Sequence, residues 1–227
     1  MRIVSWNTCA KPVENHLVKL RPDIAVLPEW GSLPLTAPRD ALSFAQFGED
    51  GKRGLGVAAW RGWSVSEADV EPLPKGIIGA VDVAGPTTFK LIAVWPYLSK
   101  QLLTNPVMQA LQLWADWVAE GPLVVAGDFN TGSAWTDCPA YKDHPPIVAQ
   151  LGELGLRSAY HDFHGVKQGV DEATTFVSSR WKSHHMIDHI FAPTDWTITG
   201  FEIGGEDPWL GRSDHMPLIA DLEPGAR

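Results

Sequence analysis

The segment that decides the fold is LVVAGDFN, residues 123–130. An apolar run of strand length ends at Gly127, and Asp128 and Asn130 follow on alternate positions. Because alternate side chains of an extended chain point to the same side, we expect both polar groups to emerge together from the end of a buried strand. A second interpretation of the segment alone stays open, since Asp and Asn after Gly are also common turn formers.

The composition of the 227 residues is that of a folded protein with a sizeable core. Hydrophobic residues make up 44% of the chain and charged residues 20%, a balance that excludes a disordered protein. No linker rich in Pro, Gly or Ser, no block of charge and no internal repeat divides the sequence. We therefore expect residues 1–227 to form a single domain.

The charge of the chain limits the partners that it can hold. A formal net charge of −9 is opposite in sign to that of a protein that grips duplex DNA by neutralising many phosphates. An acidic chain can still act on a phosphate if carboxylates hold a divalent cation, which then supplies the local positive charge. The chain also has 11 Trp residues, and those not needed in the core are available to stack on a base or a sugar.

The sequence also carries expectations about location and assembly. Cys9 and Cys138 lie far apart and show neither a disulfide framework nor the spacing of zinc ligands. No basic segment followed by an apolar run opens the chain, and no stretch approaches the roughly 18 apolar residues of a membrane span. We expect a cytoplasmic monomer with reduced thiols that does not contact a membrane.

Polar residues follow other segments that are predicted as buried strands. Residues 2–6 are expected to form a strand that leads to Asn7, and residues 24–27 a strand that leads to Glu29. Helices are expected at 11–20, from 106 to the Gly-Pro pair at 121–122, and at 145–154, and further strands at 54–60, 77–83, 89–95, 174–177, 186–191, 196–203 and 216–222. Many strands and few helices with mixed connections indicate packed sheets covered by helices.

Two more motifs complete an ordered set, namely MIDHIF at residues 186–191 and SDH at residues 213–215. With Asn7, Glu29 and the GDFN of residues 127–130, they resemble the endonuclease/exonuclease/phosphatase superfamily from Arg2 to Leu222. The resemblance implies an α/β (α+β) fold of the deoxyribonuclease I type. It is a four-layer α/β/β/α sandwich of two mixed β-sheets flanked by helices.

The resemblance also implies a metal site. Asn7 and Glu29 match the first two motifs of the superfamily, with Glu29 as the principal ligand of Mg²⁺ or Mn²⁺ and Asn7 beside it. Asp214 matches a carboxylate at or near the metal. Two alternatives remain open from the residues alone, because Glu29 also fits a surface carboxylate after a strand and Asn7 a simple turn residue.

Four further residues match the positions that act on the phosphate. Asp128 matches the Asp that orients or deprotonates the attacking water, and Asn130 the Asn that holds a phosphate oxygen. Asp188 matches the Asp that positions the final His or stabilises the phosphate, and His215 the imidazole that contacts the scissile phosphate. A structural salt bridge at Asp188 and a chance surface pair at residues 214–215 are the competing interpretations. The chemistry fits independently, because in-line attack builds negative charge that a carboxylate-held cation and an imidazolium stabilise.

The sequence departs from the superfamily at two positions. Trp95 stands where many relatives carry His or Tyr, and indole cannot serve as an acid. Met186 stands where relatives commonly carry Arg or His, which removes one phosphate contact. His184 and His185 lie nearby and are candidates to replace that contact, and solvated loop histidines are the competing interpretation. The candidate substrate-binding residues are Trp95, Tyr97, His185, Trp181 and Arg212.

Three functions follow as hypotheses. The first is a divalent-metal-dependent phosphodiester hydrolase, most of all an endo- or exonuclease that acts on DNA or on short or single-stranded nucleic acid, without a covalent intermediate. The alternative is a phosphatase or phosphodiesterase that acts on a small phosphorylated metabolite or a lipid head group. The third is a non-catalytic binding module whose site has decayed at Trp95 and Met186.

Overall fold

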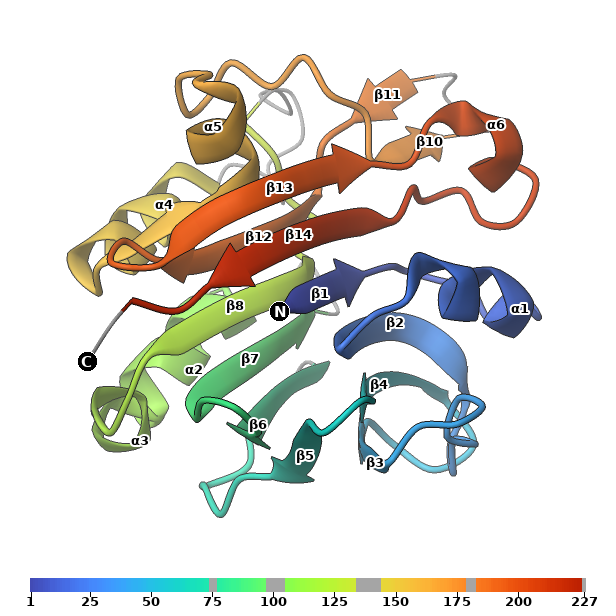
Figure 1. Cartoon of the computed structure of the whole chain (residues 1–227), viewed down its shortest axis with the longest axis horizontal. Coiled ribbons are helices and arrows are strands. Elements are labelled where there is room, and N and C mark those ends of the chain that lie inside the picture. The colour runs from blue at the N-terminus through green and yellow to red at the C-terminus, as the bar shows by residue number, and fades with distance from the viewer. Residues whose placement is uncertain (74–76, 97–104, 134–143, 179–182, 226–227) are drawn as a thin grey trace.

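Two six-stranded β-sheets lie face to face with helices on their outer sides (Figure 1). The computed structural model describes residues 1–73, 77–96, 105–133, 144–178 and 183–225. Helices α1 and α6 lie to one side of the view and α2, α3 and α4 to the other. The four-layer α/β/β/α sandwich expected from the sequence is therefore confirmed.

Each sheet is mixed, because one pair of strands within it is parallel. The first sheet has the order β13(Thr197–Ile203), β14(Leu218–Glu223), β1(Arg2–Ser5), β2(Ile24–Ser32), β4(Arg53–Ala59) and β3(Ser43–Phe47). The second has the order β5(Ser64–Glu67), β6(Ile77–Ala84), β7(Phe89–Trp95), β8(Leu123–Asp128), β12(Asp188–Pro193) and β9(Leu156–Ser158). The parallel pairs are β1 with β2 and β7 with β8. A separate two-stranded sheet joins β10(Phe176–Ser178) to β11(Ser183–His185).

Helices bury the outer face of each sheet. On the second sheet lie α2(Pro106–Leu113), α3(Ala115–Ala119) and α4(His144–Glu153), whose apolar side chains pack on β6, β7, β8 and β12. On the first sheet lie α1(Glu14–Leu17), a 3₁₀ helix (Val18–Leu20) and α6(Glu206–Trp209). The short helix α5(Ala159–His164) packs against β13, where the rings of Tyr160 and Phe201 are 5.9 Å apart.

The central core lies between the two sheets, and strand alternation fixes which residues enter it. Val124 and Ala126 of β8 and Ile190 and Ala192 of β12 all face this layer. The same alternation places Asp128, the last residue of β8, and Asp188, the first residue of β12, on this face. Two carboxyl groups therefore border the inter-sheet core at the end of strand β8 and the beginning of strand β12.

Several elements differ from those expected from the sequence. The first helix begins at Glu14 rather than at residue 11, since the preceding residues form turns. The helix expected from residue 106 to the Gly-Pro pair is two helices, because Trp114 between them has non-helical φ −102° and ψ 22°. Its indole donates a hydrogen bond to the carbonyl of Glu71 at 2.8 Å. Strands β3, β5, β9 and β11 and helices α5 and α6 were not expected.

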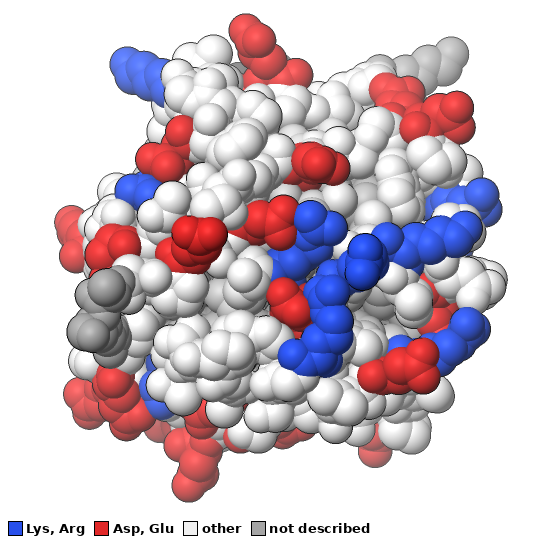
Figure 2. Space-filling view, in the orientation of Figure 1, with Lys and Arg blue, Asp and Glu red and all other residues white. Residues whose placement is uncertain are grey.

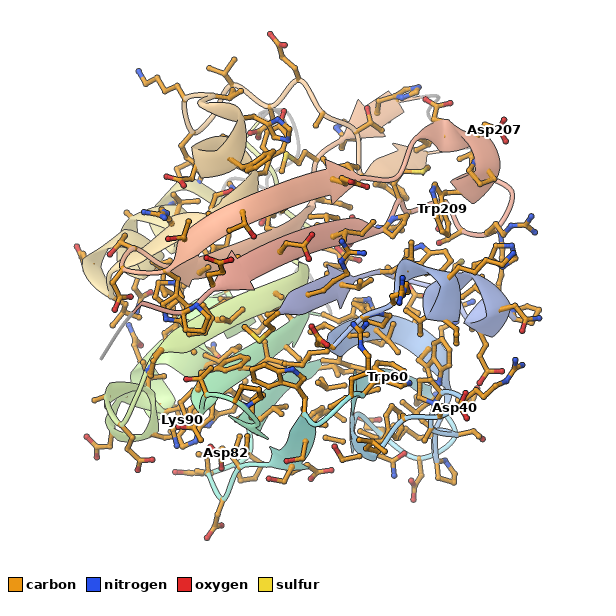
Figure 3. The ribbon with its side chains drawn as sticks, in the orientation of Figure 1. Asp40, Trp60, Asp82, Lys90, Asp207 and Trp209 are labelled. Carbon is orange, nitrogen blue, oxygen red and sulfur yellow. The ribbon has the colours of Figure 1, made fainter. Side chains whose placement is uncertain are left out.

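The charged side chains are distributed unevenly over the face that Figure 2 shows. Figure 2 shows acidic side chains over much of one face and a run of Lys and Arg near its centre. Ion pairs join Arg2 to Asp221 at 2.8 Å and Lys90 to Asp82 at 3.0 Å, the latter two being labelled in Figure 3. Ion pairs at the surface, such as these partly exposed ones, each contribute about 0–1 kcal/mol to stability. None of the helices in the described segments combines the length and apolar character that a bilayer span requires.

Gly127 marks a close approach of two strands. It lies opposite Val94 across the parallel pair β7 and β8, and its φ is 145°. A Cβ atom at this position would lie 2.0 Å from the carbonyl oxygen of Val94. Only glycine fits, because both the backbone conformation and the space exclude a side chain.

Replacing Gly127 with Ala is expected to lower the free energy of unfolding by about 3 kcal/mol or more, since backbone must move and strain is added. Gly152→Ala in α4 is the matched control, because no heavy atom lies within 4 Å of the added Cβ. That change is expected to be neutral or to stabilise by up to about 1 kcal/mol. Urea unfolding followed by Trp fluorescence measures both. Equal stability of Gly127→Ala and wild type would contradict the close approach.

Candidate active site

One side-chain amide, from the segment that follows β1, joins an acidic residue of β2 to one at the end of β8. Asn7 Nδ2 donates hydrogen bonds to Glu29 Oε1 at 3.1 Å and to Asp128 Oδ2 at 2.9 Å. Asn7 Oδ1 accepts a hydrogen bond from the backbone N–H of Cys9 at 3.0 Å. This acceptor role assigns the amide nitrogen to the side of the carboxyl groups. Residues far apart in the sequence thus meet as the motifs predicted.

Glu29 reaches the cluster through a backbone irregularity. The pairing of β2 with β4 shifts register between Leu27 and Gly31, and Glu29 has φ 52°. Regular alternation from Ala25 and Leu27, which face α1, would send the Glu29 side chain to the outer face. A left-handed non-glycine residue costs about 1–3 kcal/mol. The carbonyl of Glu29 is held by the hydroxyl of Thr8 at 2.7 Å.

A buried imidazole lies between two carboxyl groups. His215 Nδ1 is 2.8 Å from Asp188 Oδ2, and His215 Nε2 is 3.9 Å from Asp128 Oδ2. The ring of Phe176 covers the imidazole at 4.8 Å between centroids. His215, Asp188 and Asp128 are each at most 5% exposed. The second oxygen of Asp188, Oδ1, is buried without a hydrogen-bond partner in the described part of the chain.

Two hydroxyl residues hold the backbone of this arrangement, and sequence reasoning missed both roles. Thr175 Oγ1 accepts hydrogen bonds from the backbone N–H groups of Ile187 at 2.9 Å and Asp188 at 3.1 Å. Ser213 Oγ donates to the carbonyl of Asn7 at 2.7 Å and accepts from the N–H of His215 at 3.1 Å. Ser213 stood in a quoted motif, but its contact with Asn7 joins opposite ends of the chain.

Burial and neighbouring charges set the protonation states. Burial raises the pKa of Asp128 to about 7, and Asp188 adds to this while His215 and Asn7 oppose it. Burial by itself lowers the pKa of His215, but Asp188 and Asp128 outweigh it and raise the pKa to about 10. His215 is therefore an imidazolium at neutral pH, with an Nε2–H that lies too far from Asp128 to form a short hydrogen bond.

The donor set of the cluster fits a hard divalent cation. Ligand atoms of Asp128, Asp188 and His215 lie within 4.8 Å of one another. The carboxylate oxygens of the cluster are hard donors. The unpartnered Asp188 Oδ1 and the carboxylate of Glu29 are such oxygens, which suit Mg²⁺ or Mn²⁺ better than soft metals.

Asn130 and Asp214 lie next to the cluster. The backbone N–H of Asn130 donates to Asp128 Oδ1 at 2.8 Å, and φ of Asn130 is 51°. No hydrogen bond of the Asn130 side chain to a described residue is found. Asp214 Oδ1 lies 3.5 Å from the hydroxyl of Ser213. Burial raises the pKa of the Cys9 thiol, and the nearby charge of Asp214 raises it further.

The predicted substrate-binding residues are more scattered. Trp95 ends β7 and is half-buried against the inter-sheet core, and His185 in β11 is also half-buried. Arg212 is exposed and lies near His16, whose pKa is lowered by burial and then by this charge. Tyr97 and Trp181 fall outside the described residues. Met186 is buried in the core.

The cluster brings together carboxyl, amide and imidazole groups, which are suited to chemistry on a phosphoester bond. The model of the Endonuclease/Exonuclease/phosphatase family matches residues 4–215, and the chain belongs to this family. Its members are hydrolases that act on phosphoester bonds. The superfamily predicted from the sequence motifs is thereby confirmed.

Solved structures share the fold over almost the whole chain. An AP endonuclease from Archaeoglobus fulgidus has a TM-score of 0.70 and 17% identity, covering 98% of this chain and 99% of its own. The APE2 catalytic domain from Xenopus laevis has a TM-score of 0.69 and 17% identity, with 100% and 94% coverage. The human Nocturnin catalytic domain with a bound sulfate anion has a TM-score of 0.63 and 17% identity, with 98% and 94% coverage. No curated protein sequence matches the chain.

A second buried network backs the cluster on the opposite face of β12. His189 Nε2 lies 3.2 Å from the carbonyl of Thr131, whose hydroxyl lies 3.1 Å from His144 Nδ1. The rings of His144 and His189 are 4.5 Å apart. Burial lowers the pKa of His144 to about 4, and the opposing charges of Asp171 and His161 have smaller effects. The network anchors the segment that follows Asn130.

Acid is expected to weaken the fold through His144. An imidazole titrates near pH 6.5 in the unfolded chain and near 4 in the folded protein. Between these values the unfolded state binds more protons, so the free energy of unfolding falls as the pH falls. We expect a loss of about 2 kcal/mol between pH 7 and pH 5 from this residue, and buried His189 acts in the same direction.

Urea unfolding at pH 7 and pH 5 measures this effect. His144→Gln should show a smaller loss of stability on acidification than wild type. His164→Gln is the control, because His164 is exposed. An identical pH dependence in wild type and His144→Gln would contradict the assignment.

Proposed function

We propose that the protein is a divalent-metal-dependent phosphodiesterase, and specifically a nuclease. The observation that carries the proposal is the buried imidazole of His215, held by Asp188 at 2.8 Å with its other nitrogen 3.9 Å from Asp128, which the amide of Asn7 contacts. A fixed cation next to buried carboxyl groups is suited to an anionic reacting group whose charge grows during the reaction. The proposal goes further than the family, which fixes the class of bond but not the substrate.

The metal would be held by Glu29, with Asp214 at or near it and Asn7 orienting the Glu29 carboxylate. A bound Mg²⁺ or Mn²⁺ polarises a phosphate oxygen and offsets the charge that develops there. In the described structure the Asn7 amide donates a hydrogen bond to one oxygen of the Glu29 carboxylate, Oε1. The carboxylate-rich donor set supports this assignment.

The protein groups divide the remaining work. Asp128, with a pKa near 7, orients the attacking water and accepts its proton. The Nε2–H of His215 donates to a non-bridging phosphate oxygen, and Asp188 fixes the tautomer through Nδ1. Asn130, whose backbone is tied to Asp128, offers its amide to another phosphate oxygen. Water attacks phosphorus in line with the leaving oxygen, the P–O ester bond to that oxygen breaks, and the leaving oxygen takes a proton from solvent water, so no enzyme nucleophile is needed.

The acidic charge favours a short or single-stranded nucleic acid over a long duplex. The net charge of −9 opposes the binding of a long duplex with many phosphates, and ion pairs engage cations such as Arg2. Trp95 and His185 remain the proposed contacts to the substrate. The same charge balance also favours the second candidate, a phosphatase or phosphodiesterase for a small phosphorylated metabolite or lipid head group.

An activity panel with Mg²⁺ or Mn²⁺ distinguishes these functions. We expect hydrolysis of single-stranded DNA or RNA and of bis-p-nitrophenyl phosphate, loss in excess chelator and recovery on addition of metal. Hydrolysis of p-nitrophenyl phosphate alone would favour the phosphatase. No hydrolysis of any substrate would overturn the proposal and favour the binding module.

Substitutions in the cluster test the assigned roles. Asp128→Asn and His215→Ala are each expected to lower kcat by about 10²-fold to 10⁴-fold, because a proton acceptor or a phosphate donor is lost. His164→Ala, which changes an exposed histidine, should keep wild-type kcat. Circular dichroism and thermal melting establish that each variant is folded. Full activity in folded His215→Ala would exclude its role.

A further inference from the structure

Arg53 forms an ion pair with the proposed metal ligand. Its guanidinium Nη1 donates to Glu29 Oε2, the carboxylate oxygen that Asn7 does not hold. Arg53 is the first residue of β4 and lies opposite Ser32 in register with β2, so its backbone is fixed by the sheet. Both oxygens of Glu29 thus have a hydrogen-bond donor in the described structure.

The two partners of this ion pair differ in exposure. The side chain of Glu29 is 17% exposed, whereas that of Arg53 is 52% exposed. The guanidinium therefore touches the cluster with one edge and solvent with the other. A guanidinium has five N–H donors in a planar fork, and one hydrogen bond to Glu29 leaves donors for another anion.

A divalent cation and Arg53 require the same carboxylate. Glu29 cannot give its full charge to a cation while Oε2 is held by the guanidinium, and two cations next to one carboxylate repel each other. Cation binding must therefore weaken the ion pair. The released guanidinium lies at the solvent-facing side of the cluster, where a phosphodiester would enter.

We propose that Arg53 is a phosphate-binding residue that pairs with Glu29 in the metal-free protein and turns to a phosphate oxygen of the substrate when a cation takes Glu29. This inference rests on the proposed function. Its chemistry is that of the Arg fork, which matches two phosphate oxygens, whereas Lys provides a point charge. The ion pair then keeps the carboxylate from standing uncompensated before the cation binds.

The proposal predicts effects of opposite sign in one variant. Arg53→Gln should bind Mn²⁺ about 2-fold to 5-fold more tightly by titration calorimetry, since a competing exposed ion pair is removed. The same variant should raise KM for bis-p-nitrophenyl phosphate about 10-fold or more with little change in kcat, because a charged hydrogen bond to the phosphate is lost. Arg53→Lys should have a KM between those of wild type and Arg53→Gln.

Lys52→Gln is the matched control, because it removes an exposed neighbouring cation that has no assigned role. It should leave the Mn²⁺ affinity and KM as in wild type. Unchanged Mn²⁺ affinity and KM in active Arg53→Gln would overturn the role of Arg53 and leave the proposed function intact. Weaker Mn²⁺ binding would also overturn it, since Arg53 would then support the ligating position of Glu29. Wild type that neither binds Mn²⁺ nor hydrolyses a phosphodiester would overturn both proposals.

Discussion

The rest of the site depends on the register of β8 with β12, which sets Asp128 directly opposite Asp188. Two carboxyl groups on the same face of neighbouring strands repel each other, and burial makes the repulsion stronger. The chain compensates with groups from its two ends. His215 comes from the segment before the last strand and Asn7 from the end of the first, and the hydroxyl of Ser213 joins these two segments.

The compensation gives the two carboxyl groups different surroundings. Asp188 has a hydrogen bond to the imidazolium at 2.8 Å, whereas Asp128 has the neutral amide of Asn7 and a more distant imidazole nitrogen at 3.9 Å. Pairs of titratable groups in unlike environments are how a site separates a proton acceptor from a charge stabiliser. Asp188 serves the orientation of His215, and Asp128 keeps an oxygen for the proposed reaction.

The strand-end motifs were predictable from the sequence, because an apolar run followed by a polar residue is a local pattern. The central strands and the meeting of Asn7, Glu29 and Asp128 followed from such patterns. The edge strands β3, β5 and β9 are short, and their pairing depends on the neighbouring strand more than on their own residues. The contacts of Thr175 and Arg53 depend on tertiary register, which no spacing in one sequence reveals.

The irregular backbone at Glu29 means that the fold and the site depend on different features of β2. In β2 the apolar positions before it keep their alternation whether or not the shift in register is present. A single-residue deletion there could preserve the sheet while turning the carboxylate outward. An insertion or deletion in this strand would therefore remove the carboxylate from the site while the architecture is kept. A substitution in the core would not have this effect.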